Sequence, residues 1–169
     1  VMVQAFYQGG LTIFDWTDPA KPFEVAFHDR GPLDATRMIS GGSWSAYWYN
    51  GQIYGAEIAR GIDVFRLTPS EFLSENELAA ANLVRFEEFN SQNQPKVTWP
   101  PSFVVAKAYL DQMERGKTID ATRATALRTA LDRGDTRSGR NAATLDELDK
   151  MAAQLDSDAA APGARDGAR

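Results

Sequence analysis

Hydrophobic and polar residues alternate with a period of two along the first third of the chain, a pattern typical of β-strands. Turn residues separate the alternating segments. Gly9-Gly10 follows the first segment, and Asn50-Gly51, a strong hairpin signal, follows the fourth. The six segments are VMVQAFY, LTIFDW, FEVAFHD, SAYWY, QIYGAEI and IDVFRL. We therefore expect a β-hairpin followed by a third strand, and then a three-stranded meander over residues 43–67.

After residue 67 the apolar spacing changes to three and four, which is typical of amphipathic helices. Capping boxes, in which a small polar residue precedes Glu by three positions, predict where helices begin. The boxes are Thr68-Pro69-Ser70-Glu71, Ser74-Glu75-Asn76-Glu77 and Thr144-Leu145-Asp146-Glu147. We expect one helix from the first two boxes to about Leu83, a second over residues 102–115, a third capped by Asp120, and a fourth that begins at Thr144. Residues 86–101, rich in Asn and Pro, predict an extended connector.

The aromatic residues divide the chain. All 18 of them lie between Phe6 and Tyr109, and the last sixty positions contain none. From Ser157 onward, Ala, Gly, Pro, Asp and Arg show no periodicity, which favours disorder. We therefore expect four parts: two partial β-sheet units over residues 1–67, a helix, connector and helix packing on the sheet over 68–115, a helical extension over 116–156, and a disordered tail over 157–169.

The strand segments contain an internal repeat. A shift of 51 residues places Gly10, Leu11, Ile13 and Phe14 on Gly61, Ile62, Val64 and Phe65. A period of forty to fifty residues with about four short strands is typical of a β-propeller blade, and propellers contain about four to eight blades. The first segment begins at Val1 with no methionine before it. We expect the chain to be the carboxyl-terminal portion of a longer protein, or its sheet to be completed by partner chains.

The segment from Gly10 to Asp15, GLTIFD, with the turn Asp18-Pro19-Ala20-Lys21-Pro22, resembles one repeat of the bacterial LVIVD-repeat β-propeller proteins. The second copy departs from that pattern, because Arg66 stands where the repeat has Asp and Thr68-Pro69 replaces the Asp-Pro turn. The resemblance implies a mainly β fold, with two terminal propeller blades of antiparallel meanders followed by α-helices. It also implies an exported or cell-envelope location, but no reaction and no cofactor.

Composition excludes several classes of function. The net charge is −5, and neither half of the chain is basic, so we expect no nucleic-acid partner. The chain has no cysteine and a single histidine, which excludes thiol chemistry and thiolate metal sites. No apolar run is long enough for a membrane span. We expect no cofactor and no metal.

An aromatic cluster supplies the first candidate binding residues. Trp44 and Trp48 lie in SWSAYWY, and strand alternation would place both on the same face as Ala46, with Tyr47 and Tyr49 opposite. Exposed indoles could stack on a sugar or a peptide. Packing between neighbouring sheets explains the same pattern, and we favour it over a ligand site unless one indole is exposed.

Charged residues near two strand ends supply the other candidates. His28 and Asp29 form the histidine-bearing cluster, but neighbouring strand residues point to opposite faces, which favours a structural role. Glu57 and Arg60 flank a tight turn, and Asp63 follows. Glu57 and Asp63 could be the paired acids of a hydrolase. An exposed ion pair at the turn is the simpler interpretation.

These observations favour a non-enzymatic binding or scaffold module whose partner is another protein or the remaining propeller blades. One alternative is a hydrolase or lyase whose active site lies at the propeller channel and is completed by other blades. Another is a structural subunit of a larger assembly that docks through its helices.

Overall fold

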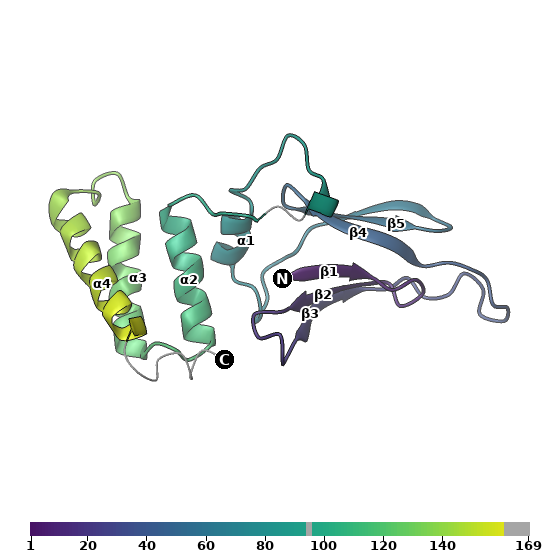
Figure 1. The fold of residues 1–169 in the computed structure, drawn as a ribbon, viewed down its shortest axis with the longest axis horizontal. Coiled ribbons are helices and arrows are strands. Elements are labelled where there is room, and N and C mark those ends of the chain that lie inside the picture. Colours follow the sequence, from purple (N-terminus) through teal and green to yellow (C-terminus); the bar gives the residue numbers. More distant parts are fainter. Residues whose placement is uncertain (94–95, 161–169) are drawn as a thin grey trace. The chain divides into compact units, whose positions relative to one another are not determined.

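The computed structural model describes residues 1–93 and 96–160, which belong to two compact units (Figure 1). The first, here called the sheet unit, comprises residues 1–73 and 81–98. The second, the helical unit, comprises residues 74–80 and the chain from Trp99 onward. Each unit has its own hydrophobic core.

The sheet unit contains all six expected strands, arranged in two antiparallel sheets. Sheet A has the order β1-β2-β3, and sheet B has the order β4-β5-β6. The strands are β1 (Met2–Ala5), β2 (Leu11–Asp15), β3 (Phe23–His28), β4 (Ser43–Tyr49), β5 (Gln52–Glu57) and β6 (Gly61–Phe65). The expected meander is confirmed. Tyr49 pairs with Gln52 across Asn50-Gly51, and both turn residues have positive φ, as the dipeptide predicted.

The two sheets face each other and share one core. Leu11 and Ile13 of β2 pack against Ile53 of β5, surrounded by partly buried side chains from β1, β3, β4 and β6. Tyr7 and Ser43 bond through their backbones near one edge of the sheets. At the other edge the ring of His28 lies 4.6 Å from that of Phe65. The sheets therefore face each other strand by strand, β3 opposite β6.

The helical unit contains three amphipathic helices, α2 (Phe103–Arg115), α3 (Ala121–Asp135) and α4 (Ala142–Ala160). All of the short helix α1 (Glu75–Ala81) except its last residue also belongs to this unit. The apolar stripes of α2, α3 and α4 pack on one another, with Leu110, Leu127 and Leu131 buried. More of the described residues lie in helices than in strands. The chain is thus mixed α/β, and the expectation of a mainly β chain is corrected.

The predicted helix starts are confirmed at three sites. Ser102 caps α2 and Asp120 caps α3. The box at Ser74 forms in both directions: the backbone N–H of Glu77 donates to the Ser74 hydroxyl, and the backbone N–H of Ser74 donates to the Glu77 carboxylate at 2.7 Å. These signals depend on neighbouring residues alone, which explains why the sequence predicts them.

The other two boxes do not start helices. Residues 68–73 form a loop, because Leu73 is buried in the sheet unit and Phe72 packs on Phe23 at 5.5 Å. The fourth helix begins two residues before Thr144 and is capped by Asn141, whose side-chain oxygen accepts from the Thr144 backbone N–H. Residues 157–160 belong to that helix, so the expectation that they are disordered is wrong. The rest of the expected disordered tail, residues 161–169, lies outside the described residues.

A partly buried ion pair, in which only the Glu77 side chain is shielded from solvent, makes the helical unit sensitive to acid. The Glu77 carboxylate accepts hydrogen bonds from both terminal nitrogens of Arg115, at 2.7 and 2.9 Å. Burial by itself would raise the pKa of Glu77, but the bonds from Arg115 and Ser74 outweigh it and hold the pKa below its usual value. A carboxyl whose pKa is lower in the folded state stabilises that state above its unfolded pKa. The contribution is lost as the pH falls through the folded value.

We expect the helical unit to lose stability below about pH 4, where an unfolded glutamate takes up its proton. Glu77→Gln should lower the stability at pH 7 and flatten this part of its pH dependence. Urea unfolding followed by far-ultraviolet circular dichroism at pH 7 and pH 3 measures both effects. Glu75→Gln, at an exposed position of the same helix, is the control. An unchanged pH dependence in Glu77→Gln would contradict the assignment.

Candidate functional site

The six candidate residues from the sequence lie in the sheet unit, but they do not form one site. Trp44 and Trp48 lie on β4, and Glu57 ends β5. His28 ends β3. Of the six, Glu57 and Arg60 make a direct polar contact, at 3.5 Å.

The Glu57 carboxylate holds two segments of backbone in place. It is almost completely buried, and it accepts from the backbone N–H groups of Gly42 at 2.8 Å, Ala59 at 2.9 Å, and Arg60. Burial by itself would raise the pKa of Glu57, but these three donors and the charge of Arg60 hold it below the usual value. Asp63, the expected second acid, is paired with Arg30. Glu57 therefore ties the β5–β6 turn to the start of β4.

His28 and Asp29 also have local structural roles. The Nε2 atom of His28 is buried without a hydrogen-bond partner, and its ring packs against Phe65. The two rings are tilted by 51° with their centroids 4.6 Å apart. The Asp29 carboxylate accepts from the Gly31 backbone N–H at 2.9 Å and so closes the turn after β3.

The two tryptophans have different environments. Trp48 is partly buried in the shared core. Trp44 is 66% exposed, because an irregularity in the β4–β5 pairing between Ser43 and Ser45 interrupts the alternation. The prediction that Trp44 shares the buried face of Trp48 is therefore wrong. Its ring lies 5.8 Å from that of Tyr7, edge to face.

Tyr7 is a residue that sequence reasoning missed. Its φ is +51°, a conformation that bulky residues rarely adopt. The backbone bonds to Ser43 and the close approach of Gly42 to the Tyr7 carbonyl hold it there. The result is an exposed aromatic pair, Tyr7 and Trp44. No pattern in the sequence predicts it, because the two residues meet through pairing of distant segments.

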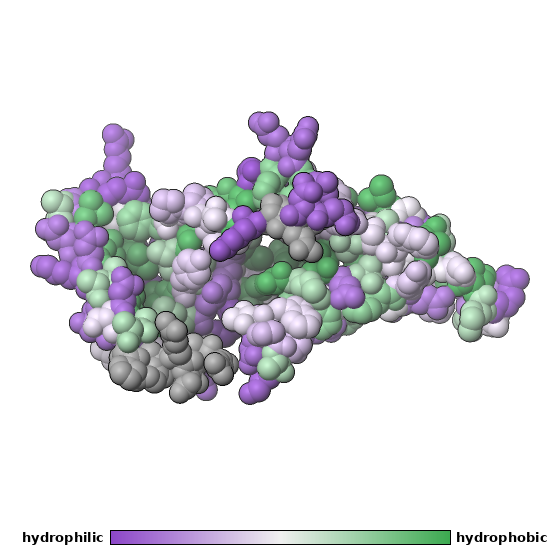
Figure 2. All heavy atoms as spheres, in the orientation of Figure 1, coloured by the Kyte–Doolittle hydropathy of each residue, from purple (hydrophilic) through white to green (hydrophobic). Residues whose placement is uncertain are grey.

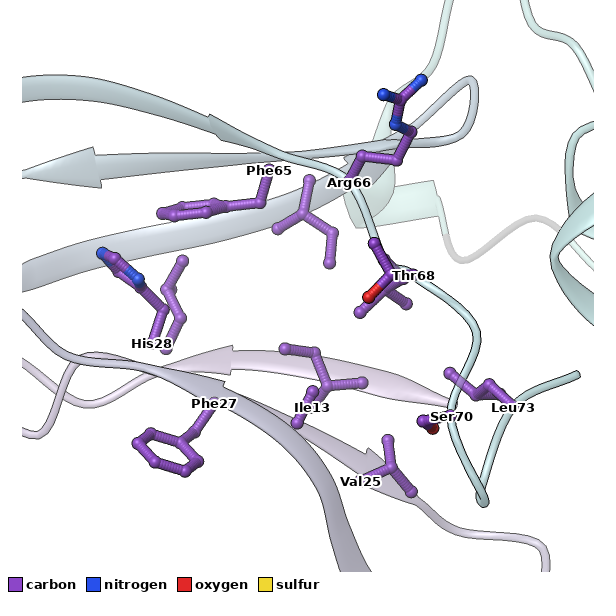
Figure 3. A pocket seen from close by; sticks show the side chains of 13 residues that line it. Ile13, Val25, Phe27, His28, Phe65, Arg66, Thr68, Ser70 and Leu73 are labelled. Atoms are coloured by element: carbon purple, nitrogen blue, oxygen red, sulfur yellow. The ribbon is translucent and has the colours of Figure 1, made fainter. Parts of the chain in front are cut away.

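A cavity of about 240 Å³ lies within the sheet unit (Figure 3). Its lining is mainly apolar and comes from β2, β3, β5, β6 and the loop after β6. Ile13, Val25, Phe65 and Leu73 point toward it, while the ring of Phe27 points away. An engineered apolar cavity of about 150 Å³ binds benzene. This one therefore has room for an apolar group as large as an aromatic side chain.

The outer face of sheet B, the face away from sheet A, is apolar and largely exposed. Strand pairing places Tyr47 of β4, Tyr54 of β5 and Val64 of β6 in one row across it, with Ile62 beside them. Ile62 is 76% exposed and Val64 is 55% exposed. Figure 2 shows hydrophobic side chains reaching the surface over the strands. Isolated exposed apolar residues are ordinary, but a contiguous group marks an interaction site.

One end of the outer face is covered by the connector. Tyr49 donates to the Phe86 carbonyl at 2.8 Å, and its ring lies 6.5 Å from that of Phe89. The Asn50 side chain bonds both the N–H and the carbonyl of Phe86. The connector is thus fixed to the β4–β5 turn, and the exposed group begins beyond it.

Residues 1–93 and 96–160 contain no group of three or more His, Asp or Glu side chains placed to hold a metal ion. In the same residues no helix is long and apolar enough to cross a membrane.

Comparisons with known proteins give no information on the outer face of sheet B. The chain matches no family model, and no curated protein or solved structure matches it either. The resemblance to LVIVD repeats consequently stays a prediction. Any function must be argued from the packing of the two sheets and from the surface that they leave open.

Proposed function

We propose that the two sheets are neighbouring blades of a larger β-propeller of the LVIVD type. In this proposal the sheet unit is a non-enzymatic binding or scaffold module of an exported or envelope-associated bacterial protein. The observation that carries the proposal is the exposed apolar outer face of sheet B. Blades pack face to face, so a blade at this position needs another sheet or a partner protein to cover that face.

The internal repeat supports the same interpretation. A shift of 51 residues relates β1 to β5 and β2 to β6. In a four-stranded blade, sheet A would then hold the second, third and fourth strands, and sheet B the first, second and third. The two sheets are the same motif displaced by one strand, and each presents one face to the shared core.

The alternatives draw less support from the structure. The paired-acid hydrolase or lyase needs a free carboxylate, whereas Glu57 is bound to three backbone donors and Asp63 to Arg30. A subunit that docks through its helices needs an open apolar stripe, whereas α2, α3 and α4 bury theirs in a common core. Neither observation favours a second function.

Light scattering of the 169-residue chain tests the proposal. We expect the chain to self-associate with rising concentration, because burying an apolar face releases roughly 25 cal/mol per Å². The double variant Ile62→Lys with Val64→Lys should be largely monomeric. Its near-ultraviolet circular dichroism should match that of the unchanged chain, because both side chains are exposed.

Met38→Lys, at a fully exposed position in the loop before β4, is the matched control and should associate as the unchanged chain does. A monomer at every concentration, with a rigid aromatic signal, would mean that the chain needs no further sheet, and it would overturn the proposal.

A further inference from the structure

In the described part of the chain no strand pairs with the outer edge of β6, although the corresponding strand of the repeat is paired on both sides. β2, the counterpart of β6, pairs with β3, whereas β6 ends sheet B. The shift of 51 residues places the counterpart of β3 at residues 74–79. There the capping box at Ser74 starts α1 instead. Within residues 1–93 and 96–160, the chain therefore does not supply a fourth strand to sheet B.

The cavity lies beside Phe65, the last residue of this edge strand. It is bounded by β3, by Phe65 at the end of β6, and by the loop that ends at Leu73. Along β6, Asp63 and Phe65 share the inward side, and Ile62 and Val64 share the outward side. A strand beside β6 would have the same alternation. One of its inward side chains would enter the cavity near Phe65 (Figure 3).

The two faces of such a strand have different requirements. The inward position is apolar, because Ile13, Val25 and Leu73 line the space. Outward positions would pack on Ile62 and Val64. Arg66 directly follows β6 and points away from the cavity, so it would attract an acidic residue beside it (Figure 3). Strand β3, with the sequence FEVAFH, already combines apolar alternation with an acidic residue.

We propose that the edge of β6 binds an extended, β3-like segment of another polypeptide as a fourth antiparallel strand. One apolar side chain of that segment fills the cavity. Main-chain hydrogen bonds along an open edge give such complexes affinity, and the pocket gives them selectivity. This inference rests on the proposed function and names the chemistry of its partner.

The test uses the full chain and a fluorescent peptide with the sequence of residues 19–29, PAKPFEVAFHD. We expect anisotropy to show saturable binding with a Kd below about 1 mM, a free energy of about −4 kcal/mol. The same peptide with Val25→Pro should bind at least tenfold more weakly, since proline removes a donor and breaks the strand. Hydrogen exchange at residues 61–65 should slow when the peptide binds.

Two variants of the chain locate the site. Leu73→Trp should fill the cavity and weaken peptide binding at least tenfold, while Met38→Trp, on an exposed loop, should not change it. Near-ultraviolet circular dichroism confirms that each variant is folded. Absence of binding, equal binding by both peptides, or slowed exchange away from β6 would overturn the inference.

The outcomes separate this inference from the proposed function. If the peptide fails to bind but Ile62→Lys with Val64→Lys still removes self-association, the inference falls and the proposed function stands. If the chain is monomeric throughout, the proposed function falls. A third outcome is that the chain still self-associates when Ile62→Lys and Val64→Lys are both present, and that the peptide inhibits this self-association. That outcome would mean that a second copy of the chain occupies the edge of β6, and it would overturn the inference that a different polypeptide binds there.

Discussion

Replacing Gly42 with alanine is expected to unfold the sheet unit, whereas the same change at Gly61 should be tolerated. Both glycines have strongly positive φ, +89° and +96°. A Cβ atom at Gly42 would lie 2.0 Å from the backbone oxygen of Tyr7, while one at Gly61 would meet nothing within 4 Å. The obstacle at Gly42 is backbone that is itself bonded to Ser43, so it cannot move aside cheaply.

We expect Gly42→Ala to cost at least about 4 kcal/mol, a large part of the stability of an ordinary domain. Gly61→Ala should cost about 1–2 kcal/mol, the penalty of a left-handed conformation alone. Urea unfolding followed by tryptophan fluorescence compares the two, since Trp16, Trp44 and Trp48 lie in the sheet unit and Trp99 alone begins a segment of the helical unit. Equal losses at the two glycines would show that the close approach of Gly42 to Tyr7 is incorrect.

Shortening Leu11 should be the most damaging of the simple core truncations in the sheet unit. Leu11 is 2% exposed and lies between the sheets, with its Cδ1 atom close to Gly55 of β5. Leu→Ala changes at such positions cost about 3–5 kcal/mol, from lost burial and from the cavity that remains. The loss should appear in the tryptophan signal, because Trp48 packs against the same core.

The matched control is Met38→Ala, which shortens a side chain that is 100% exposed and should change stability by less than about 0.5 kcal/mol. A Leu11→Ala variant as stable as this control would mean that the sheets do not share a core. That result would also remove the packing argument for neighbouring blades.

The strands could be predicted because their determinants are local. Alternation fixes which residues are extended, and Asn50-Gly51 fixes the β4–β5 turn with both residues at positive φ. Ser74 and Asp120 likewise cap helices through bonds to residues three positions away. Each of these signals is complete within a few residues, so no knowledge of the tertiary fold is needed to read it.

The candidate site could be predicted less well, because its determinants are distant in sequence. The role of Glu57 depends on Gly42, fifteen residues earlier. The exposure of Trp44 depends on a pairing irregularity that period-two reasoning cannot detect. The loop that replaces the helix at Thr68 forms because Leu73 and Phe72 are held by the sheet unit. Tertiary contacts overrode a capping signal that was correct in form.

Because most of α1 belongs to the helical unit, the two units alternate along the chain and neither is one continuous segment. The chain passes from the sheet unit to the helical unit after Leu73, returns after Ala80, and leaves again after Thr98. Arg115 and its partner Glu77 thus belong to one unit although a stretch of the other unit separates them in sequence. A single protease cut after Leu73 would detach residues 81–98 from the sheet unit, and one after Thr98 would separate Ala80 from Val105 and Ala108, with which it forms a buried cluster. The two units should therefore be inherited, expressed and degraded together.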